Sequence, residues 1–148
     1  MIKALAIFFA LLFCGTVAAN GLSPSHADDT VLKVDEAFQL MPLEYDGKQL
    51  RVSWEIAPGH YLYRKRLEFK LLDPVAMKLP KPQLPRGIME RDEHFGKVEV
   101  YRGMTLAANF KWPKSAKTPQ RLQVRYQGCA DIGICYPPQT RVLELMPQ

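Results

Sequence analysis

Two cysteines lie close together near the C-terminal end of the chain, in the stretch "QGCADIGICYPP" at residues 127–138. Cys129 and Cys135 are separated by five residues, with glycines around them and two prolines behind. A disulfide between them would close a small loop, for which chain-entropy theory gives only about 2.4 kcal/mol of stabilisation. A domain of this length can have a core of its own. Composition alone therefore leaves a structural cross-link and a redox couple about equally open.

The N-terminus has the pattern of a secretory signal peptide. Lys3 is followed by an apolar run over residues 4–13 and then by small residues, which is the order found in such signals. The run is too short to span a bilayer. We expect residues 1–19 to be the signal peptide, with a cut after Ala27 as the alternative.

Export would leave two cysteines in the mature chain. Cys14 lies in the signal and is removed with it, so Cys129 and Cys135 remain as an even count in an oxidising compartment.

The formal charge of the whole chain is +5, with Lys and Arg scattered among acidic residues. Because no basic run is interleaved with aromatic residues, we do not expect nucleic-acid binding.

Apolar and polar residues alternate with a period of two over most of the mature chain, which is typical of half-buried strands. Turn signals such as "DG", "PG" and "DP" separate the alternating segments. Short strands at this spacing predict an all-β fold, an immunoglobulin-like antiparallel β-sandwich over residues 31–148. A disordered leader is expected at residues 20–30. The predicted strands cover residues 50–56, 66–71, 105–112, 121–126 and 140–145.

The strand order also predicts where the cysteines lie. They fall between the strands at 121–126 and 140–145, so we expect them at the mouth of a hairpin at one edge of the sandwich. The proline-rich segment 73–87 predicts a long extended connection across the surface.

Three stretches resemble one protein family, in the order in which that family has them. "YQGCADIGICYPPQT" at 126–140 is similar to the active-site segment of the N-terminal periplasmic domain of the thiol:disulfide interchange protein DsbD. "GHYLYRKRL" at 59–67 resembles its aromatic segment, and "DEHFGKVEVYR" at 92–102 resembles its cap loop and the following strand. The resemblance implies an immunoglobulin-like fold, a periplasmic location and a redox-active disulfide with no other cofactor.

The resemblance also implies roles for individual residues. Cys135 is expected to form the mixed disulfide with partner proteins, and Cys129 is expected to resolve it. This chemistry requires a thiolate, an accessible sulfur and an in-line approach. The site is expected to be lined by Tyr61, Tyr63 and Tyr136.

The expected cap loop comprises residues 92–96. Asp92 and Glu93 match the acidic pair of the family, and carboxylates near a thiol disfavour its thiolate form. The family usually has an aromatic residue next, which shields the disulfide, but this chain has His94 followed by Phe95. Either ring could be the shield, and we favour Phe95 as the more apolar one. Gly96 offers a hinge.

The implied partners are a thioredoxin-like domain as electron donor, and periplasmic disulfide isomerases and cytochrome c maturation thioredoxins as acceptors. A membrane electron-transfer domain would belong to the same or a separate chain.

Two other functions stay open. One is a non-catalytic immunoglobulin-like binding module with a structural disulfide. The other is a metallochaperone using Cys129, Cys135 and His94, although one histidine beside two thiols is weak evidence for a metal site.

Overall fold

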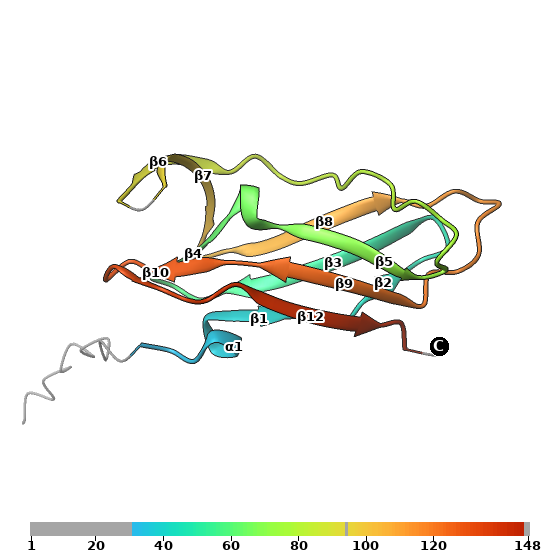
Figure 1. Cartoon of the computed structure of the whole chain (residues 1–148), viewed down its shortest axis with the longest axis horizontal. Helices are drawn as coiled ribbons and strands as arrows, with labels where there is room; N and C mark the ends of the chain where they lie inside the picture. The colour runs from blue at the N-terminus through green and yellow to red at the C-terminus, as the bar shows by residue number, and fades with distance from the viewer. Residues whose placement is uncertain (1–30, 94, 147–148) are drawn as a thin grey trace, which may run out of the picture.

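The computed structural model describes residues 31–93 and 95–146, which fold almost entirely into antiparallel strands (Figure 1). The signal peptide and leader expected at 1–19 and 20–30, and His94, lie outside the described residues. Within the described residues no helix has the length and apolar character needed to cross a membrane. The elements are α1 (Val34–Ala37), β1 (Phe38–Leu40), β2 (Glu44–Tyr45), β3 (Gln49–Ile56), β4 (His60–Tyr63), the 3-10 turn η1 (Arg64–Arg66), β5 (Glu68–Asp73), β6 (Ile88–Asp92), β7 (Gly96–Arg102), β8 (Thr105–Lys111), β9 (Arg121–Tyr126), β10 (Gly128–Ala130), β11 (Ile134–Cys135) and β12 (Gln139–Glu144).

Two sheets face each other as the predicted immunoglobulin-like sandwich, so the predicted fold class is confirmed. In one sheet β3 pairs with β1, β2 and β8, and in the other β9 lies between β5 and β12. The five strands predicted from alternation correspond to β3, β5, β8, β9 and β12. Along β3 the apolar residues Leu50, Val52, Trp54 and Ile56 are all buried, as the period of two requires.

Aromatic side chains join the two sheets across the main core. The Trp54 ring of β3 contacts Phe69 of β5 and Tyr126 of β9, with ring centroids 6.2 and 5.7 Å apart. Phe69 in turn contacts Phe110 of β8 at 5.1 Å. These edge-to-face pairs come from opposite sheets, and such pairs stabilise a core beyond the area that they bury.

A third sheet forms one end of the molecule, on the left in Figure 1, with the strand order β11-β10-β4-β7-β6. Only Gln127 separates β9 from β10, so the main sandwich continues directly into this sheet. The β6–β7 hairpin lies at its outer edge. The segment between β5 and β6 contains the predicted extended connection, and its side chains Leu79 and Leu84 pack against the core.

The third sheet has a small apolar cluster that is separate from the main core. Its buried members are Tyr63, Val98, Val100 and Cys129, and the half-buried Cys135 packs against them. The main core contains the large aromatic side chains of both sandwich sheets instead. The disulfide therefore belongs to a local cluster at the end of the fold.

This separation predicts that the fold survives reduction. Reducing the Cys129–Cys135 bond should leave the far-ultraviolet circular dichroism of the sheets unchanged. It should lower the melting temperature by about 10 °C or less, because the loop that the bond closes is short. Thermal unfolding with and without dithiothreitol measures this. Loss of the cooperative transition at room temperature in reductant would show that the bond is a structural cross-link.

Candidate functional site

Strand register brings the candidate residues to one face of the third sheet. The Cα of Cys129 in β10 lies opposite Cys135 of β11 on one side and Tyr61 of β4 on the other. Residues directly opposite each other share a face, and successive residues of one strand alternate between faces. Tyr63 therefore points the same way as Tyr61, while Leu62 between them enters the core.

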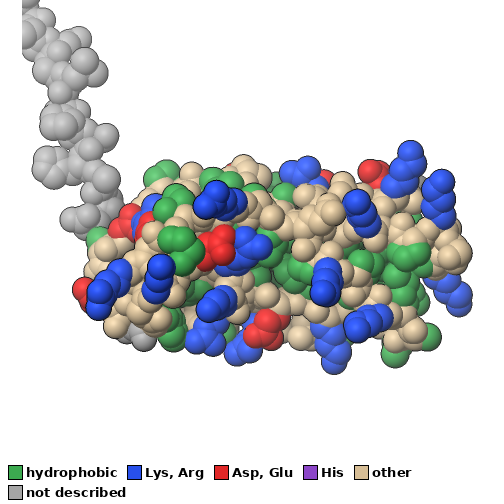
Figure 2. Space-filling view, turned by 90° about the horizontal axis from the view of Figure 1, so that it is seen from above, with side chains coloured by type: hydrophobic (Ala, Val, Ile, Leu, Met, Phe, Trp, Pro, Cys, Tyr) green, Lys and Arg blue, Asp and Glu red, His purple; other side chains and the backbone are tan. Residues whose placement is uncertain are grey.

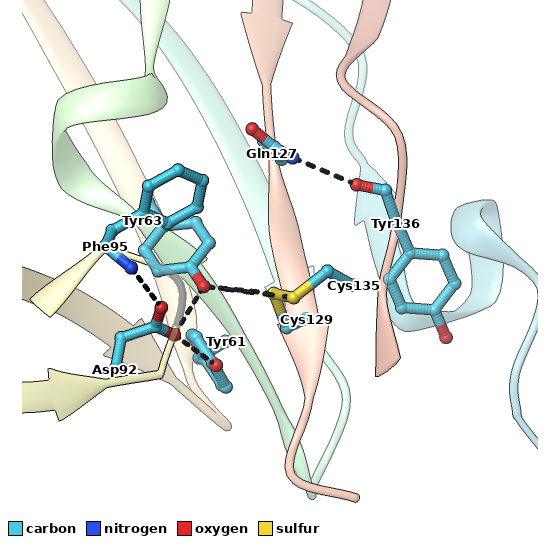
Figure 3. The surroundings of a disulfide bond; sticks show 8 residues. All are labelled: Tyr61, Tyr63, Asp92, Phe95, Gln127, Cys129, Cys135 and Tyr136. Carbon is cyan, nitrogen blue, oxygen red and sulfur yellow. Dashed lines mark hydrogen bonds between the residues drawn. A yellow bond between two sulfur atoms is a disulfide. The ribbon is translucent and has the colours of Figure 1, made fainter. Parts of the chain in front are cut away.

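The β6–β7 hairpin brings a carboxylate to this face. Tyr63 lies opposite Val100 of β7, and Val100 lies opposite Ile88 of β6. Alternation along β6 then places Glu90 and Asp92 on the same side as Ile88. The candidate site is thus built from three segments that are far apart in sequence, namely β4, the β6–β7 hairpin and the β10–β11 hairpin, and Figure 3 shows its central residues.

The two sulfurs differ in exposure. Cys129 and Cys135 form a disulfide, with their Cα atoms 4.0 Å apart. Cys129 is 0 % exposed, while Cys135 is half-buried. Cys135 borders an open cleft of about 630 Å³ between the β6–β7 hairpin and the turn that joins β10 to β11. Of the two cysteines, Cys135 is therefore the one on the solvent side, and Cys129 lies in the interior.

Asp92 ties the hairpin to β4. One oxygen of its carboxylate accepts hydrogen bonds from the hydroxyls of Tyr63, at 2.6 Å, and Tyr61, at 3.0 Å. The other oxygen accepts a hydrogen bond from the backbone N–H of Phe95 at 2.9 Å. Hydrogen bonds to a charged acceptor are stronger than neutral ones, so this carboxylate fixes both the cap loop and the two rings below it.

The Tyr63 hydroxyl connects this network to the disulfide. Its oxygen lies 3.1 Å from Sγ of Cys129 and 4.0 Å from Sγ of Cys135 (Figure 3). Burial first, and the hydrogen bond to Asp92 second, raise the pKa of Tyr63 far above its ordinary value. The hydroxyl therefore keeps its proton at any physiological pH and remains a hydrogen-bond donor beside the sulfur.

An ion-pair cluster that the sequence did not predict forms one wall of the cleft. Arg102 of β7 bonds Glu90 of β6, at 2.5 Å, and also Asp131 in the turn between the cysteines. Its guanidinium lies 4.6 Å above the Tyr61 ring centroid. The single charge of Arg102 thus joins the hairpin, the cysteine turn and β4. Sequence spacing held no signal for it, because these residues meet only through sheet register.

Phe95 of the cap loop lies beside Tyr63. The Phe95 ring stands edge-on to the Tyr63 ring, with centroids 5.2 Å apart. The ring that Phe95 covers is therefore that of Tyr63. Glu93 is exposed, and Gly96 is the first residue of β7, opposite Asp92. Since His94 is outside the described residues, the choice between the two rings as shield stays a prediction.

Tyr136, which was expected to line the site, turns its ring to the other side of the strand (Figure 3). The ring packs against Phe38 at 5.3 Å in the main core, and its hydroxyl donates to the Leu32 carbonyl at 2.7 Å. Tyr136 directly follows Cys135, and neighbouring residues of an extended chain face opposite sides. Its ring therefore lines the core, while its backbone stays next to the reactive sulfur.

Gly128, the residue directly before Cys129, lies where a side chain would clash with its neighbours. A Cβ atom there would lie 2.2 Å from the Tyr61 carbonyl oxygen and 2.6 Å from the Phe38 ring. Only glycine allows β10, β4 and Phe38 to approach so closely. Gly133 serves the same hairpin differently, because its φ of +84° lies in the left-handed region that a tight turn between the cysteines requires.

Metal-binding side chains are not grouped in the part of the chain that the structure describes. No three His, Cys, Asp or Glu residues lie close enough there to hold an ion. The metallochaperone hypothesis needs His94, which is not among the described residues.

Comparison with known proteins identifies relatives of the whole domain. Residues 28–147 match the protein family described as "Thiol:disulfide interchange protein DsbD, N-terminal". The chain is 42% identical over 114 residues to DsbD 2 of Pseudomonas aeruginosa, which covers 77% of this chain and 18% of that protein. It is 40% identical to DsbD of Photorhabdus laumondii over 98% of this chain and 25% of that protein. The chain thus spans about a quarter or less of the length of these relatives.

A solved structure is similar in fold as well. It contains the complex between the DsbD N-terminal and PilB N-terminal domains from Neisseria meningitidis. The match has a TM-score of 0.66 and 27% sequence identity, and it covers 80% of this chain and 89% of that one.

The hydrogen bonds of Asp92 predict that it restricts access to the disulfide. Asp92→Asn weakens the bonds to both tyrosines and to the cap loop, so dithiothreitol should reduce the disulfide about 10-fold faster, equivalent to roughly 1.4 kcal/mol. Stopped-flow reduction measures the rate.

Glu93→Gln is the matched control for this substitution. It removes the same charge from the neighbouring exposed residue, so it accounts for any general attraction of the reactive thiolate form of dithiothreitol, and its rate should change by less than about twofold. Equal rates for the two variants would show that the Asp92 hydrogen bonds do not limit access.

Proposed function

Because this chain belongs to the family of DsbD N-terminal domains, we propose that it relays electrons in the periplasm through a reversible disulfide between Cys129 and Cys135. Two electrons come from a thioredoxin-like domain. That domain receives them from a membrane electron-transfer domain of the same or a separate chain. They pass to periplasmic disulfide isomerases and cytochrome c maturation thioredoxins. One observation carries this proposal: Cys135 borders an open cleft while its bonded partner Cys129 is fully buried.

The unequal exposure supports a defined order of bond changes. A donor thiolate attacks Sγ of Cys135 from the cleft, in line with the disulfide, and Cys129 leaves as the thiolate. The second donor thiol then attacks the donor sulfur of this mixed disulfide, which releases Cys135. The donor is oxidised to a disulfide, and the domain holds two thiols and two more electrons. Transfer to an acceptor reverses these steps, with Cys135 attacking and Cys129 resolving.

Tyr63 is placed to assist the departure of Cys129. Its hydroxyl proton points to Asp92 in the oxidised state, and its oxygen is 3.1 Å from the Cys129 sulfur. When that sulfur becomes a thiolate, the hydroxyl can rotate and donate to it instead, because an anionic sulfur is a better acceptor than a disulfide. This assistance requires a protonated tyrosine, which the raised pKa of Tyr63 ensures.

The negative charge of Asp92 has a second effect on the proposed relay. A carboxylate close to the two sulfurs disfavours a lasting thiolate there. The reduced domain then reacts slowly with unrelated disulfides until a partner separates the hairpin from the site. The structure of a relative in complex with another protein domain supports the view that this domain also acts by docking partners.

The exposure of the sulfurs predicts different outcomes for the two serine variants. Cys129→Ser should trap a stable mixed disulfide with a thioredoxin-like partner through Cys135, because the resolving thiol is missing. Cys135→Ser should trap little, since the remaining sulfur is buried. Non-reducing electrophoresis of each reduced variant mixed with an oxidised thioredoxin-like domain shows the adducts. The assignment is wrong if Cys135→Ser traps as much as Cys129→Ser.

The reduction potential separates this proposal from a structural disulfide. An exchanging bond should equilibrate with glutathione or thioredoxin-like proteins, at a potential above about −300 mV, whereas structural disulfides typically lie below that value. Redox titration in glutathione buffers, followed by alkylation and mass spectrometry, measures it. A bond that stays oxidised throughout the titration would favour the binding module with a structural disulfide.

A further inference from the structure

A second concave surface lies beside the cap loop and shares Tyr63 with the site described above. It is a groove of about 270 Å³ whose floor includes the rings of Tyr63 and Phe95. Three exposed cations surround that floor, Lys65 and Arg66 from η1 and Lys97 from β7. We call this surface the basic groove.

The cations of the basic groove are not neutralised by the described part of the chain. Among residues 31–93 and 95–146, no carboxylate oxygen lies within 4.0 Å of the charged nitrogens of Lys65, Arg66 or Lys97. Six other arginines do have such partners.

Glu99, the carboxylate on the groove wall, is already engaged. It accepts hydrogen bonds from Gly87 N–H and from Arg64, each at 2.8 Å, which lower its pKa. The positive charge of the three groove cations is therefore available to a partner.

Arg66 connects the basic groove to the disulfide through two rings. Its guanidinium carbon lies 4.7 Å from the centroid of the Phe95 ring. Phe95 stands edge-on to Tyr63, whose hydroxyl oxygen is 3.1 Å from the Cys129 sulfur. A cation over an aromatic face stabilises the position of that ring. Anything that moves Arg66 away from Phe95 therefore loosens the packing next to the redox centre.

The surrounding surface has the same sign of charge. Figure 2 looks from above onto the face that includes η1 and the β6–β7 hairpin, and its Lys and Arg side chains outnumber its Asp and Glu side chains. Such a field attracts a negatively charged partner before contact and raises the rate of association.

We propose that the basic groove docks an acidic segment of the protein that exchanges electrons with this domain. The inference rests on the proposed relay and names the kind of surface that its partner presents. Carboxylates of the segment pair with Lys65, Arg66 and Lys97, and Arg66 moves from Phe95 to its new partner. A concave groove with an aromatic floor fits a protruding peptide better than a flat membrane surface.

The test uses two synthetic dithiol peptides as electron donors. Both contain Cys-Gly-Pro-Cys, one flanked by glutamates and the other by serines. Stopped-flow kinetics give the rate at which each reduces the disulfide in three proteins. These are the wild type, the groove variant Lys65→Gln/Lys97→Gln, which leaves Arg66 on the Phe95 ring, and the control variant Lys111→Gln/Lys114→Gln. The control removes the same charge from exposed residues at the other end of the sandwich. Each peptide is compared only with itself, so differences in thiol pKa between peptides cancel.

The expected result is specific to one peptide and one variant. The groove variant should react about fivefold more slowly than the wild type with the glutamate peptide, and within about twofold of it with the serine peptide. The control variant should resemble the wild type with both. In 0.5 M NaCl the difference for the glutamate peptide should fall below about twofold, because salt screens exposed charges.

Three other results would overturn the proposal. Equal slowing by the groove and control variants would mean that only net charge matters. Binding to phosphatidylglycerol vesicles that the groove variant loses, without any effect on the glutamate peptide, would assign the groove to a membrane surface. A disulfide that neither peptide nor dithiothreitol reduces would refute the proposed relay, and this inference with it. Slowing confined to the glutamate peptide, with normal reduction by dithiothreitol, would support both.

Discussion

The candidate site depends on the hydrogen bonds that the Asp92 carboxylate accepts. This carboxylate holds the end of β6 against β4 by accepting hydrogen bonds from two tyrosine hydroxyls and from the backbone of the cap loop. The same bonds direct the Tyr63 oxygen to the buried sulfur. One hydrogen-bonded carboxylate thus positions the Tyr63 hydroxyl beside the Cys129 sulfur and joins β6 to both β4 and the backbone of Phe95.

The residues around the disulfide and the residues of the main core form separate clusters. The large aromatic contacts between the sandwich sheets involve Trp54, Phe69 and Tyr126, and the disulfide belongs to a separate small cluster. A relay must exist both with and without its disulfide, so its fold cannot depend on that bond. The separation of the disulfide cluster from the main core fits that requirement of the proposed relay.

The sequence predicted the parts of the structure that follow from local patterns. Alternation located the main strands, and the close spacing of the cysteines was consistent with a hairpin. Contacts that depend on how distant strands align were beyond such patterns. The Arg102 cluster is one example, because it joins β7, β6 and the cysteine turn. Tyr136 is another, since resemblance located it next to Cys135, while strand geometry turns its ring into the core. The strand β6, with exposed Ile88 and Met89, lacks a clean alternating pattern altogether.

Along β4 and β10, core and site residues occupy alternate positions of the same strands. His60 and Leu62 are buried in the interior, whereas Tyr61, Tyr63 and Cys129 face the redox centre. A substitution at a position that faces the disulfide therefore leaves the inward-facing core contacts of the same strand in place. A library that varies only the outward positions around the cysteines could therefore explore new redox partners while the inward positions preserve the scaffold.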